Sequence, residues 1–588
     1  MSPASDRDLQ SIREARRLAR QAKAAQARLA ELSQDEIDAI VDAAAGAAAA
    51  EAEPLAALAA EETGYGVVAD KVRKNLFAAR DVHRFIRPMK TVGVIRRHED
   101  RRVLEIAEPF GVVAALVPST NPTSTAIYKI LIALKARCAI VISPHPAAVR
   151  CITRAADLMA RAARRAGAPE HAIGWMTAVA LEGTQELMRH RDIAVILATG
   201  GMGLVRAAYS AGKPAYGVGP GNAPAYIERS ADIAKAVRDI VAGKTFDNGV
   251  LCSSENSVVV DEPIAGDVRR EFEARGGHFL SPAESDAVAR VLVTPQALPN
   301  PALVGRPARE IAERAGVEVP ADTRVLIAPL EGVGRDHPLS IEKLCPVLSF
   351  YVVSDWQAGC ERCKEILGYG GMGHTMSIHS RNDAVILEFG LRKPAFRIVV
   401  NTPTTHGSIG LTTGLDPAMT LGCGGYGGNI TSDNISPLHL LNVKRLAHEI
   451  RPATSAPAAS PPADARLPEP PPAAAAPRLD GDTLADRVHA FLASRGVGGR
   501  AQEPAPPARP TGPAQPTPPP ATPAPEPAPA APDEEPAPPA AAFVCEDDVR
   551  QALRHSRSIV IDDRTIVTPA ARDLADRHRV FVHADLSR

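Results

Sequence analysis

The chain has 588 residues, and its 67 Lys and Arg nearly balance its 68 Asp and Glu, so several domains without a strong overall charge are expected. This balance argues against a protein that binds nucleic acid or an anionic membrane surface through its global field. The charged N-terminus lacks the apolar stretch of a signal peptide, and no apolar run reaches membrane-spanning length.

The first part of the chain, about 450 residues long, is predicted to be a globular α/β body. Its first ninety residues carry Ala-rich amphipathic patterns, which predict helices. Short apolar runs bounded by turn residues follow, and helical patterns separate many of them, which favours mainly parallel sheets. The predicted strands are 111–117, 139–143, 193–198, 225–227, 257–260, 325–328, 347–353 and 397–401.

Proline marks the end of this body. Of the 53 prolines, 26 lie between Pro452 and Pro539, mostly among alanines. Such segments cannot bury enough apolar surface to offset the entropy of ordering, so we expect disordered, extended linkers at 452–481 and 497–541.

Between the two linkers, residues 482–496 are free of proline and predict a short amphipathic helix. Leu484, Val488, Phe491 and Leu492 fall on one face of it. A helix of this length is marginal alone in water, so its apolar face indicates a partner surface. The alternative is a nascent helix that binds nothing.

The last segment, 542–588, is predicted to be a small α/β docking module. It has a helix pattern near 547–555, a strand at 558–561 and a strand at 580–583. Thr568 and Pro569 have the chemistry of a helix start, which places a second helix between the strands. The core of such a module is small, which favours docking over catalysis.

Three segments of the body carry chemistry beyond packing. Asn121 follows a predicted strand, where open α/β sheets place ligand-binding groups. Thr199, Gly200 and Gly201 form a strand-to-helix turn that lets phosphates approach the backbone. Cys252 lies among small polar residues and is a candidate thiolate nucleophile. Taken singly, each has an ordinary alternative: a turn, a tight glycine loop and a buried structural cysteine.

The eight cysteines form no disulfide framework, which is consistent with a reducing cytosol. They are scattered at Cys138, Cys151, Cys252, Cys345, Cys360, Cys363, Cys423 and Cys545. The pair Cys360 and Cys363 has no second pair and no nearby histidine, so two positions on one helix explain it better than a metal site. No metal is expected.

Together, the chemical segments resemble the CoA-acylating branch of the aldehyde dehydrogenase superfamily, over about residues 10–450. The stretches that carry the resemblance are 108–126, 143–146, 246–252, 342–346, 373–375 and 422–429. The resemblance implies an aldehyde dehydrogenase-like fold with two Rossmann-like domains. It divides the body into N-terminal helices with an NAD-binding domain (1–225), a catalytic domain (226–405) and a return and oligomerisation segment (406–451).

The resemblance also implies a chemical role for each segment. Cys252 attacks the aldehyde carbonyl, and the Asn121 side chain and the Cys252 backbone N–H hold the oxyanion. Nicotinamide takes the hydride, and CoA then removes the acyl group from the Cys252 thioester in a ping-pong sequence. His374 in a Gly-His-Thr motif is a candidate to deprotonate CoA as a near-neutral imidazole, although a structural histidine explains it equally well.

Cofactor binding is likewise implied for three sites. Thr199, Gly200 and Gly201 match the phosphate-side turn of the family, and Glu342 matches its ribose-binding glutamate. Ser143 and Pro144 match the adenosine-ribose stretch, but without the Lys and Glu that hydrolytic members carry there. The choice of NAD over NADP therefore depends on the branch and on no single residue.

One departure from the hydrolytic members bears on the second half-reaction. Val218 stands where those members carry a general-base glutamate that activates water. Without that base, water is a poor deacylating agent and thiolysis by CoA is expected. A hydrolytic dehydrogenase and a non-catalytic cargo scaffold are the alternatives. The resemblance favours a small aldehyde, such as acetaldehyde, propionaldehyde or sulfoacetaldehyde, and a homo-oligomer.

The tail also resembles known segments. The helix 482–496 on its linker resembles encapsulation peptides of bacterial microcompartment cargo, and 542–588 resembles a short segment of ethanolamine-type microcompartment proteins. These likenesses imply binding to shell or core proteins, and a location in the bacterial cytoplasm inside a microcompartment lumen.

Overall fold

The structure is a computed structural model, and it divides the chain into two units, Met1–Arg478 and Leu479–Arg588. It describes residues 6–451 and 453 of the first unit. In the second it describes 543–544, 546–555, 557–561, 565–567, 571, 574–575, 578 and 580–583. Apart from residue 453, the predicted linkers and the predicted helix 482–496 lie outside the described residues.

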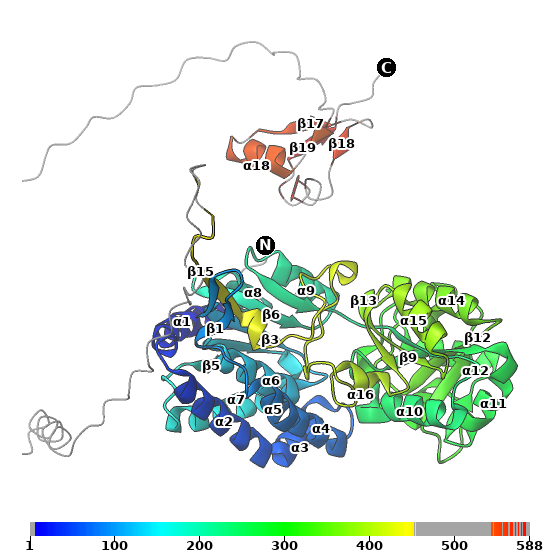
Figure 1. Cartoon of the computed structure of the whole chain (residues 1–588). Coiled ribbons are helices and arrows are strands. Elements are labelled where there is room, and N and C mark those ends of the chain that lie inside the picture. The colour runs from blue at the N-terminus through cyan, green and yellow to red at the C-terminus, as the bar shows by residue number, and fades with distance from the viewer. Residues whose placement is uncertain are drawn as a thin grey trace, which may run out of the picture. The chain divides into compact units, whose positions relative to one another are not determined.

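Residues 6–86 are mostly helical, as their patterns predict (Figure 1). A capping box at Ser33 and Glu36 starts the second helix, because each side chain bonds the backbone N–H of the other residue. Gly64, at φ 68°, ends the third. The elements are α1 (Asp6–Leu29), α2 (Gln34–Ala50), α3 (Ala52–Thr63), α4 (Val68–Leu76), the π-helix η1 (Phe77–Val82) and α5 (His83–Ile86).

A five-stranded parallel sheet forms the centre of the first domain, in the order β5-β4-β3-β6-β7. Its strands are β3 (Val112–Val117), β4 (Ile140–Pro144), β5 (Ile173–Trp175), β6 (Ile193–Thr199) and β7 (Ala215–Val218). Its helices are α6 (Pro122–Lys135), α7 (Val149–Arg165), α8 (Leu181–Arg189) and α9 (Met202–Tyr209), with a 3₁₀ turn η2 (Pro146–Ala148).

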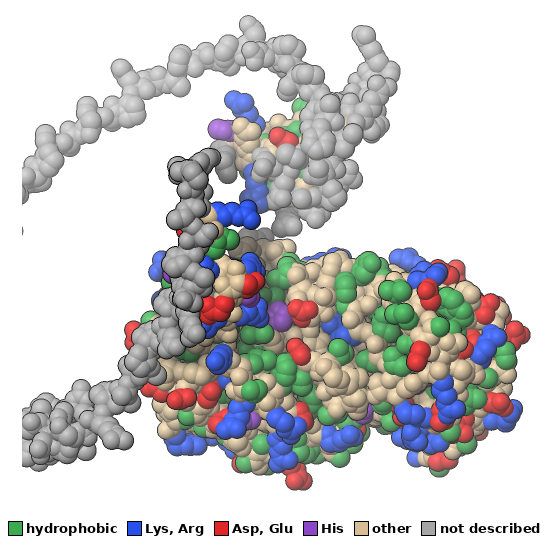
Figure 2. Space-filling model, viewed as in Figure 1, with side chains coloured by type: hydrophobic (Ala, Val, Ile, Leu, Met, Phe, Trp, Pro, Cys, Tyr) green, Lys and Arg blue, Asp and Glu red, His purple; other side chains and the backbone are tan. Residues whose placement is uncertain are grey.

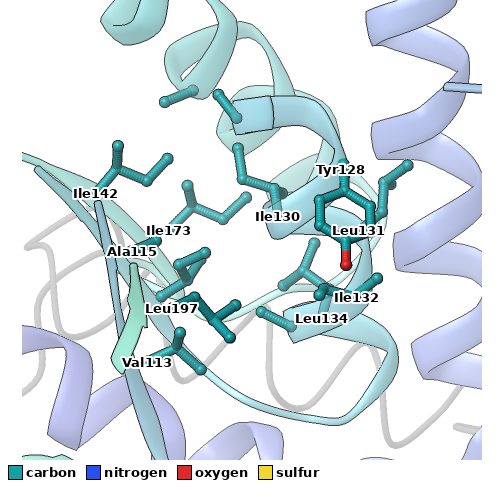
Figure 3. Packing of buried hydrophobic residues seen from close by; sticks show 14 of the residues in the cluster. Val113, Ala115, Tyr128, Ile130, Leu131, Ile132, Leu134, Ile142, Ile173 and Leu197 are labelled. Atoms are coloured by element: carbon teal, nitrogen blue, oxygen red, sulfur yellow. The ribbon is translucent and has the colours of Figure 1, made fainter. Parts of the chain in front are cut away.

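The core of this domain lies between the sheet and its helices. Every residue of α6 is buried, and β3 is apolar along its whole length, as a strand covered on both faces must be. Figure 3 shows Val113 and Leu197 of the sheet in the same packed cluster as Ile130 and Leu134 of α6.

A seven-stranded parallel sheet forms the second domain, in the order β10-β11-β12-β9-β8-β13-β14. Its strands are β8 (Ala223–Ile227), β9 (Glu255–Asp261), β10 (Gly277–Phe279), β11 (Val325–Pro329), β12 (Val347–Val353), β13 (Gly373–His379) and β14 (Ala395–Val400). Its helical elements are α10 (Ile233–Thr245), η3 (Phe246–Gly249), α11 (Glu262–Glu273), α12 (Pro282–Leu292), η4 (Pro301–Leu303), α13 (Ala308–Ala315), η5 (Pro338–Ser340), α14 (Trp356–Tyr369), α15 (Asp383–Leu391) and α16 (Thr404–Ser408).

A small antiparallel sheet joins the end of the body to its beginning. It consists of β1 (Gly93–His98), β2 (Val103–Pro109) and β15 (Leu441–Ala447), which follows the short turns η6 (Gly425–Gly427) and η7 (Pro437–Leu440). The eight predicted strands are all present, whereas this sheet and strands β5, β7, β10 and β13 were not predicted.

The second unit contains strands β16 (Phe543–Val544), β17 (Ile559–Ile561), β18 (Ile566–Val567) and β19 (Phe581–His583) and helix α18 (Glu546–Arg554). The strands pair as β16 with β18 and β17 with β19, both parallel. Helix α18 and strands β17 and β19 lie in the ranges that the sequence predicts, and β16 and β18 are additional.

The surface is charged but mixed. Figure 2 shows Lys and Arg side chains interspersed with Asp and Glu over the visible face of the body, which agrees with the balanced composition. None of the helices in the described part of the chain is both long and apolar enough to cross a bilayer.

Candidate active site

A cavity of about 460 Å³ lies where the carboxyl ends of β3, β4, β6 and β7 meet the loop before β9 of the second domain. This edge is where open parallel sheets bind ligands. Eight of the nine predicted site residues line the cavity: Asn121, Ser143, Pro144, Thr199, Gly200, Gly201, Cys252 and Glu342. His374, the ninth, contacts Cys252 from β13.

Cys252 follows a strained turn. Asp247 and Asn248 in η3 have φ values of 50° and 53°, which are left-handed and unfavourable for residues with side chains. The residue itself is half-buried and lines the cavity. Burial, followed by the charge of Glu342, raises the pKa of its thiol to about 12. In the free enzyme, Cys252 is therefore a neutral thiol near pH 7.

His374 gives Cys252 a hydrogen-bonding partner. Its Nε2 lies 3.2 Å from the Cys252 Sγ, and its Nδ1 lies 2.9 Å from the Thr375 Oγ1. Burial, with a smaller contribution from Arg397, lowers the pKa of His374 to about 3. The sequence predicts a pKa near neutrality for His374, whereas the pKa in the structure is much lower because burial disfavours the charged ring. The pair is a neutral thiol beside a neutral imidazole.

Asn121 begins α6 at the end of β3, with Pro122 at the first helical position. Its Oδ1 accepts a hydrogen bond from Lys74 Nζ at 2.6 Å, and its Nδ2 donates to the Thr120 Oγ1 at 3.2 Å. The second N–H of the amide is available for a ligand in the cavity that Asn121 lines.

The turn after β6 has the features of a nucleotide site. Gly201 caps the N-terminus of α9, and a Cβ added there would meet nothing within 4 Å, so the backbone is open to a ligand. Helix N-termini favour phosphate through their free N–H groups and dipole. Within the described residues, Thr199 Oγ1 is buried without a hydrogen-bonding partner, a state that usually signals a missing ligand or water. Ser143 shares a hydrogen bond of 2.8 Å with Thr184, and both line the cavity.

Glu342 lies between the two halves of the site. Its Oε1 accepts a hydrogen bond from the Gly221 N–H at 2.9 Å, and burial raises its pKa to about 8. Val218, at the end of β7, lines the same cavity with a side chain that cannot accept a proton. In the part of the chain that the structure describes, no cluster of three or more His, Cys, Asp or Glu residues is arranged to hold a metal ion.

Sequence reasoning missed Lys74, Arg397 and Gly221. Lys74 contacts Asn121, and Arg397 donates to the carbonyl oxygens of Ser432 (2.9 Å) and Gly422 beneath His374. A lysine on an amphipathic helix or an arginine at a strand start gives no sign of burial. From the sequence, only the spacing of Lys71 and Lys74 could indicate that both lie on one face of a helix.

Comparisons with known proteins agree with this geometry. A model described as the aldehyde dehydrogenase family matches residues 6–281. The bifunctional aldehyde-alcohol dehydrogenase AdhE of Escherichia coli is 45% identical over 399 residues, which cover 67% of this chain and 45% of that protein. The chain therefore spans about half the length of the curated aldehyde-alcohol dehydrogenases that it matches.

Two solved structures share most of the body. An acetylating aldehyde dehydrogenase from Geobacillus thermoglucosidasius is 51% identical with a TM-score of 0.76, and covers 77% of this chain and 100% of its own. A propionaldehyde dehydrogenase from the Clostridium phytofermentans fucose utilisation bacterial microcompartment is 29% identical with a TM-score of 0.67, over 73% of this chain and 96% of its own. These likenesses confirm the predicted aldehyde dehydrogenase-like α/β fold.

Proposed function

The chain belongs to the aldehyde dehydrogenase family, and we propose that it is a CoA-acylating member that oxidises a small aldehyde to an acyl-CoA with NAD. One observation carries this proposal: Cys252, which contacts His374, lines one cavity with Asn121, and in that cavity Val218 stands in place of a general base. The substrate proposed is an aldehyde of the acetaldehyde or propionaldehyde kind.

The first step uses the groups of this chain alone. The Cys252 Sγ attacks the carbonyl carbon, and the thiol proton leaves to solvent past His374 Nε2, which lies 3.2 Å from the sulfur and stays neutral. The carbonyl oxygen becomes an oxyanion that Asn121 Nδ2 and the Cys252 backbone N–H hold. A preorganised donor of this kind contributes about 10²–10³-fold to the rate.

The groups around the cavity fit a dinucleotide. The free Thr199 hydroxyl and the backbone of the turn at Gly200 and Gly201, which is open at Gly201, would hold its phosphates, and Glu342 would bind the ribose near Cys252. When bound, nicotinamide accepts the hydride of the thiohemiacetal, which leaves an acyl thioester on Cys252. NAD is proposed over NADP from the branch that the sequence resembles.

Deacylation is assigned to CoA. Val218 cannot activate water, so a hydrolytic path lacks its usual base. The CoA thiol attacks the thioester carbon, the bond to Cys252 Sγ breaks, and the released thiolate regains a proton. His374, next to the sulfur, is the group proposed to relay that proton.

For the tail we propose a role in assembly. An enzyme with a similar body comes from a bacterial microcompartment, and the sequence 482–496 carries an apolar face suited to a shell or core protein. A homo-oligomer and a place in the microcompartment lumen in the bacterial cytoplasm are part of the same proposal. A shell would retain a volatile, reactive aldehyde.

The catalytic proposal is tested by measuring NADH formation from small aldehydes with and without CoA. Sustained turnover only with CoA supports an acylating enzyme, and equal turnover without CoA supports the hydrolytic alternative. A Cys252→Ala variant that retains full turnover contradicts the proposed nucleophile. If the unaltered chain oxidises no aldehyde, the non-catalytic scaffold is favoured.

The assembly proposal is tested by co-purification with shell proteins. The full chain is compared with a chain that ends at residue 451 and with one that lacks only 482–496. Loss of co-purification in both shortened chains, with turnover unchanged, is the expected result. Co-purification that survives the truncation at 451 contradicts it.

A further inference from the structure

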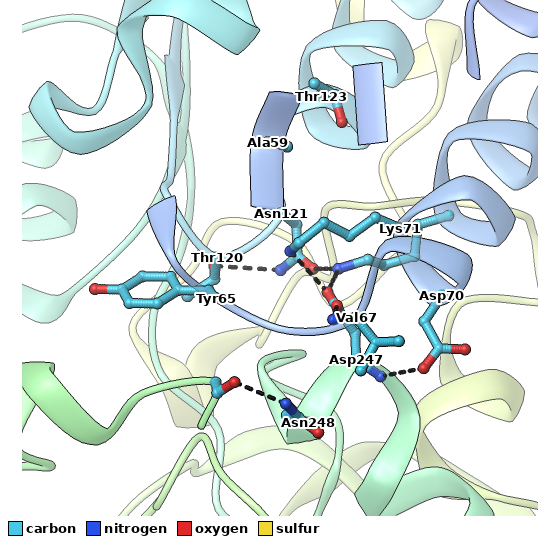
Figure 4. Close-up of polar contacts among 12 residues, drawn as sticks. Ala59, Tyr65, Val67, Asp70, Lys71, Thr120, Asn121, Thr123, Asp247 and Asn248 are labelled. Atoms are coloured by element: carbon cyan, nitrogen blue, oxygen red, sulfur yellow. Dashed lines mark hydrogen bonds and ion pairs between the residues drawn. The ribbon is translucent and has the colours of Figure 1, made fainter. Parts of the chain in front are cut away.

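Two buried lysines lie on one face of α4, beneath the candidate active site. Lys71 and Lys74 are both 2% exposed and are one turn of the helix apart. Both ammonium groups contact the Asp247 carboxylate of η3: Lys71 Nζ lies 3.0 Å from its Oδ2, and Lys74 Nζ contacts the same oxygen. Figure 4 shows Lys71 and Asp247 of this cluster together with Asn121.

The cluster ties α4 to the turn that precedes Cys252. The Asp247 Oδ1 accepts a hydrogen bond from the Val67 N–H at 2.7 Å, and the Asp247 N–H donates to Asp70 Oδ2 at 2.8 Å. These bonds hold Asp247 in its left-handed conformation at φ 50°. Two cations thus share one fully buried carboxylate. Burying both costs more desolvation free energy than the single ion pair that would suffice to link α4 to η3.

The two lysines differ in one contact. Lys74 Nζ also donates to the Asn121 Oδ1 at 2.6 Å, whereas the side-chain hydrogen bond given by Lys71 goes to Asp247. A lysine ammonium carries donors and no acceptor. The Asn121 amide must therefore turn its oxygen to Lys74, which leaves its NH₂ group on the opposite side. In the reversed orientation, an amide oxygen would face the developing oxyanion and repel it.

We propose that Lys74 is a positioning residue, which fixes the Asn121 amide so that the N–H not bonded to Thr120 faces the oxyanion. The inference rests on the proposed function, in which Asn121 stabilises that oxyanion. Asp247 contacts both parts: its carboxylate binds the Lys74 ammonium, and its backbone N–H, bonded to Asp70, fixes the turn that leads to Cys252. Lys74 and Asp247 thus connect the oxyanion donor with the turn that leads to the nucleophile.

Lys71 provides a matched control. It lies on the same helix, is equally buried and contacts the same carboxylate, so replacing it disturbs packing and charge to a similar degree. The experiment measures the single-turnover rate of NADH formation, the KM for acetaldehyde and the melting temperature. It uses the full chain with NAD and CoA, for Lys74→Met, Lys71→Met, Asn121→Ala and the double variant Lys74→Met/Asn121→Ala.

Lys74→Met is expected to lower the rate by at least tenfold, in the direction of Asn121→Ala, with KM changed by less than about threefold. The double variant should be no slower than Asn121→Ala alone, since Lys74 acts through that amide. Lys71→Met should lower the melting temperature comparably and keep the rate within about threefold. Lys74→Arg, which keeps a cation that can only donate, should retain part of the rate, whereas Lys74→Gln should not. If Lys74→Met does not fold, the comparison of Lys74→Arg with Lys74→Gln tests the role of the donor in its place.

Equal rate losses for Lys71→Met and Lys74→Met, or losses that multiply in the double variant, overturn the inference while the proposed function stands. A full rate for Asn121→Ala overturns both the role of Asn121 and the role assigned to Lys74. If the unaltered chain oxidises no aldehyde, the proposed function itself is contradicted, and the role of Lys74 falls with it.

Discussion

Gly221 offers a sharp test of how closely the site is packed, because it contacts Cys252 without taking part in the chemistry. A Cβ added at Gly221 would lie 2.0 Å from the Cys252 carbonyl oxygen and 3.4 Å from the His374 ring. Real Cβ atoms essentially never approach an oxygen closer than 3.0 Å, so Gly221→Ala must displace the backbone of Cys252.

The displacement needed is about 1 Å, and a misplacement of this size at a reacting atom costs about 10²-fold in rate. The loss should appear in kcat, since the displaced backbone carries the proposed nucleophile; the KM for NAD should rise with it, because the Gly221 N–H also bonds Glu342 Oε1. Steady-state NADH formation with saturating CoA measures it. Circular dichroism confirms that the fold is retained.

Gly368→Ala on α14 is the control, because a Cβ there meets nothing within 4 Å. It should leave kcat unchanged and alter stability by no more than about 1 kcal/mol. Gly221→Ala with kcat within a factor of three of the unaltered chain would refute the packing argument.

Three further predictions concern charge and packing. Glu342, whose pKa is raised to about 8, is neutral below that pH and charged above it, and its charge raises the pKa of Cys252. Glu342→Gln should therefore speed iodoacetamide labelling of Cys252 at pH 9.5 but not at pH 6.5. Equal acceleration at both pH values would contradict this reasoning. Because burial lowers the pKa of His374 to about 3, kcat/KM of the free enzyme should show no imidazole ionisation between pH 5.5 and 7.5, and an inflection that disappears in His374→Gln would contradict the assignment. Phe272→Ala, at a buried ring packed edge-on against Phe279 and Phe350, should lower the free energy of unfolding by about 3–5 kcal/mol in urea titration, and a loss below about 1 kcal/mol would contradict the packing.

Much of the fold could be predicted from the sequence because buried parallel strands leave a strong local signal. The run 347–353 is apolar except for Ser349 and is strand β12, and the wholly apolar run 112–117 is β3. Strands β1, β2 and β15 carry charged side chains, which hides their strand pattern, and β15 pairs with β2 across more than 300 residues. β13 was missed because its residues are mostly small and polar.

The candidate site divides in the same way. Asn121 and the turn at Thr199 were found because each follows a predicted strand, and Cys252 was found because it lies among small polar residues. The electrostatics were not predictable, because a pKa depends on neighbours brought from distant segments. Burial, and to a smaller degree Arg397, lower the pKa of His374 to about 3. Lys74 reaches Asn121 across 47 residues, a contact that only the fold creates.

The most direct test of a thioester on Cys252 awaiting CoA is a rapid-mixing experiment on the full chain. Enzyme, NAD and acetaldehyde are combined without CoA, and the NADH formed is followed while the Cys252 peptide is weighed by mass spectrometry. The account predicts one NADH per active site, an acyl group on that peptide, and renewed NADH formation when CoA is added. Continuous NADH formation before CoA is added, with free acid released and the Cys252 peptide unmodified, would contradict it.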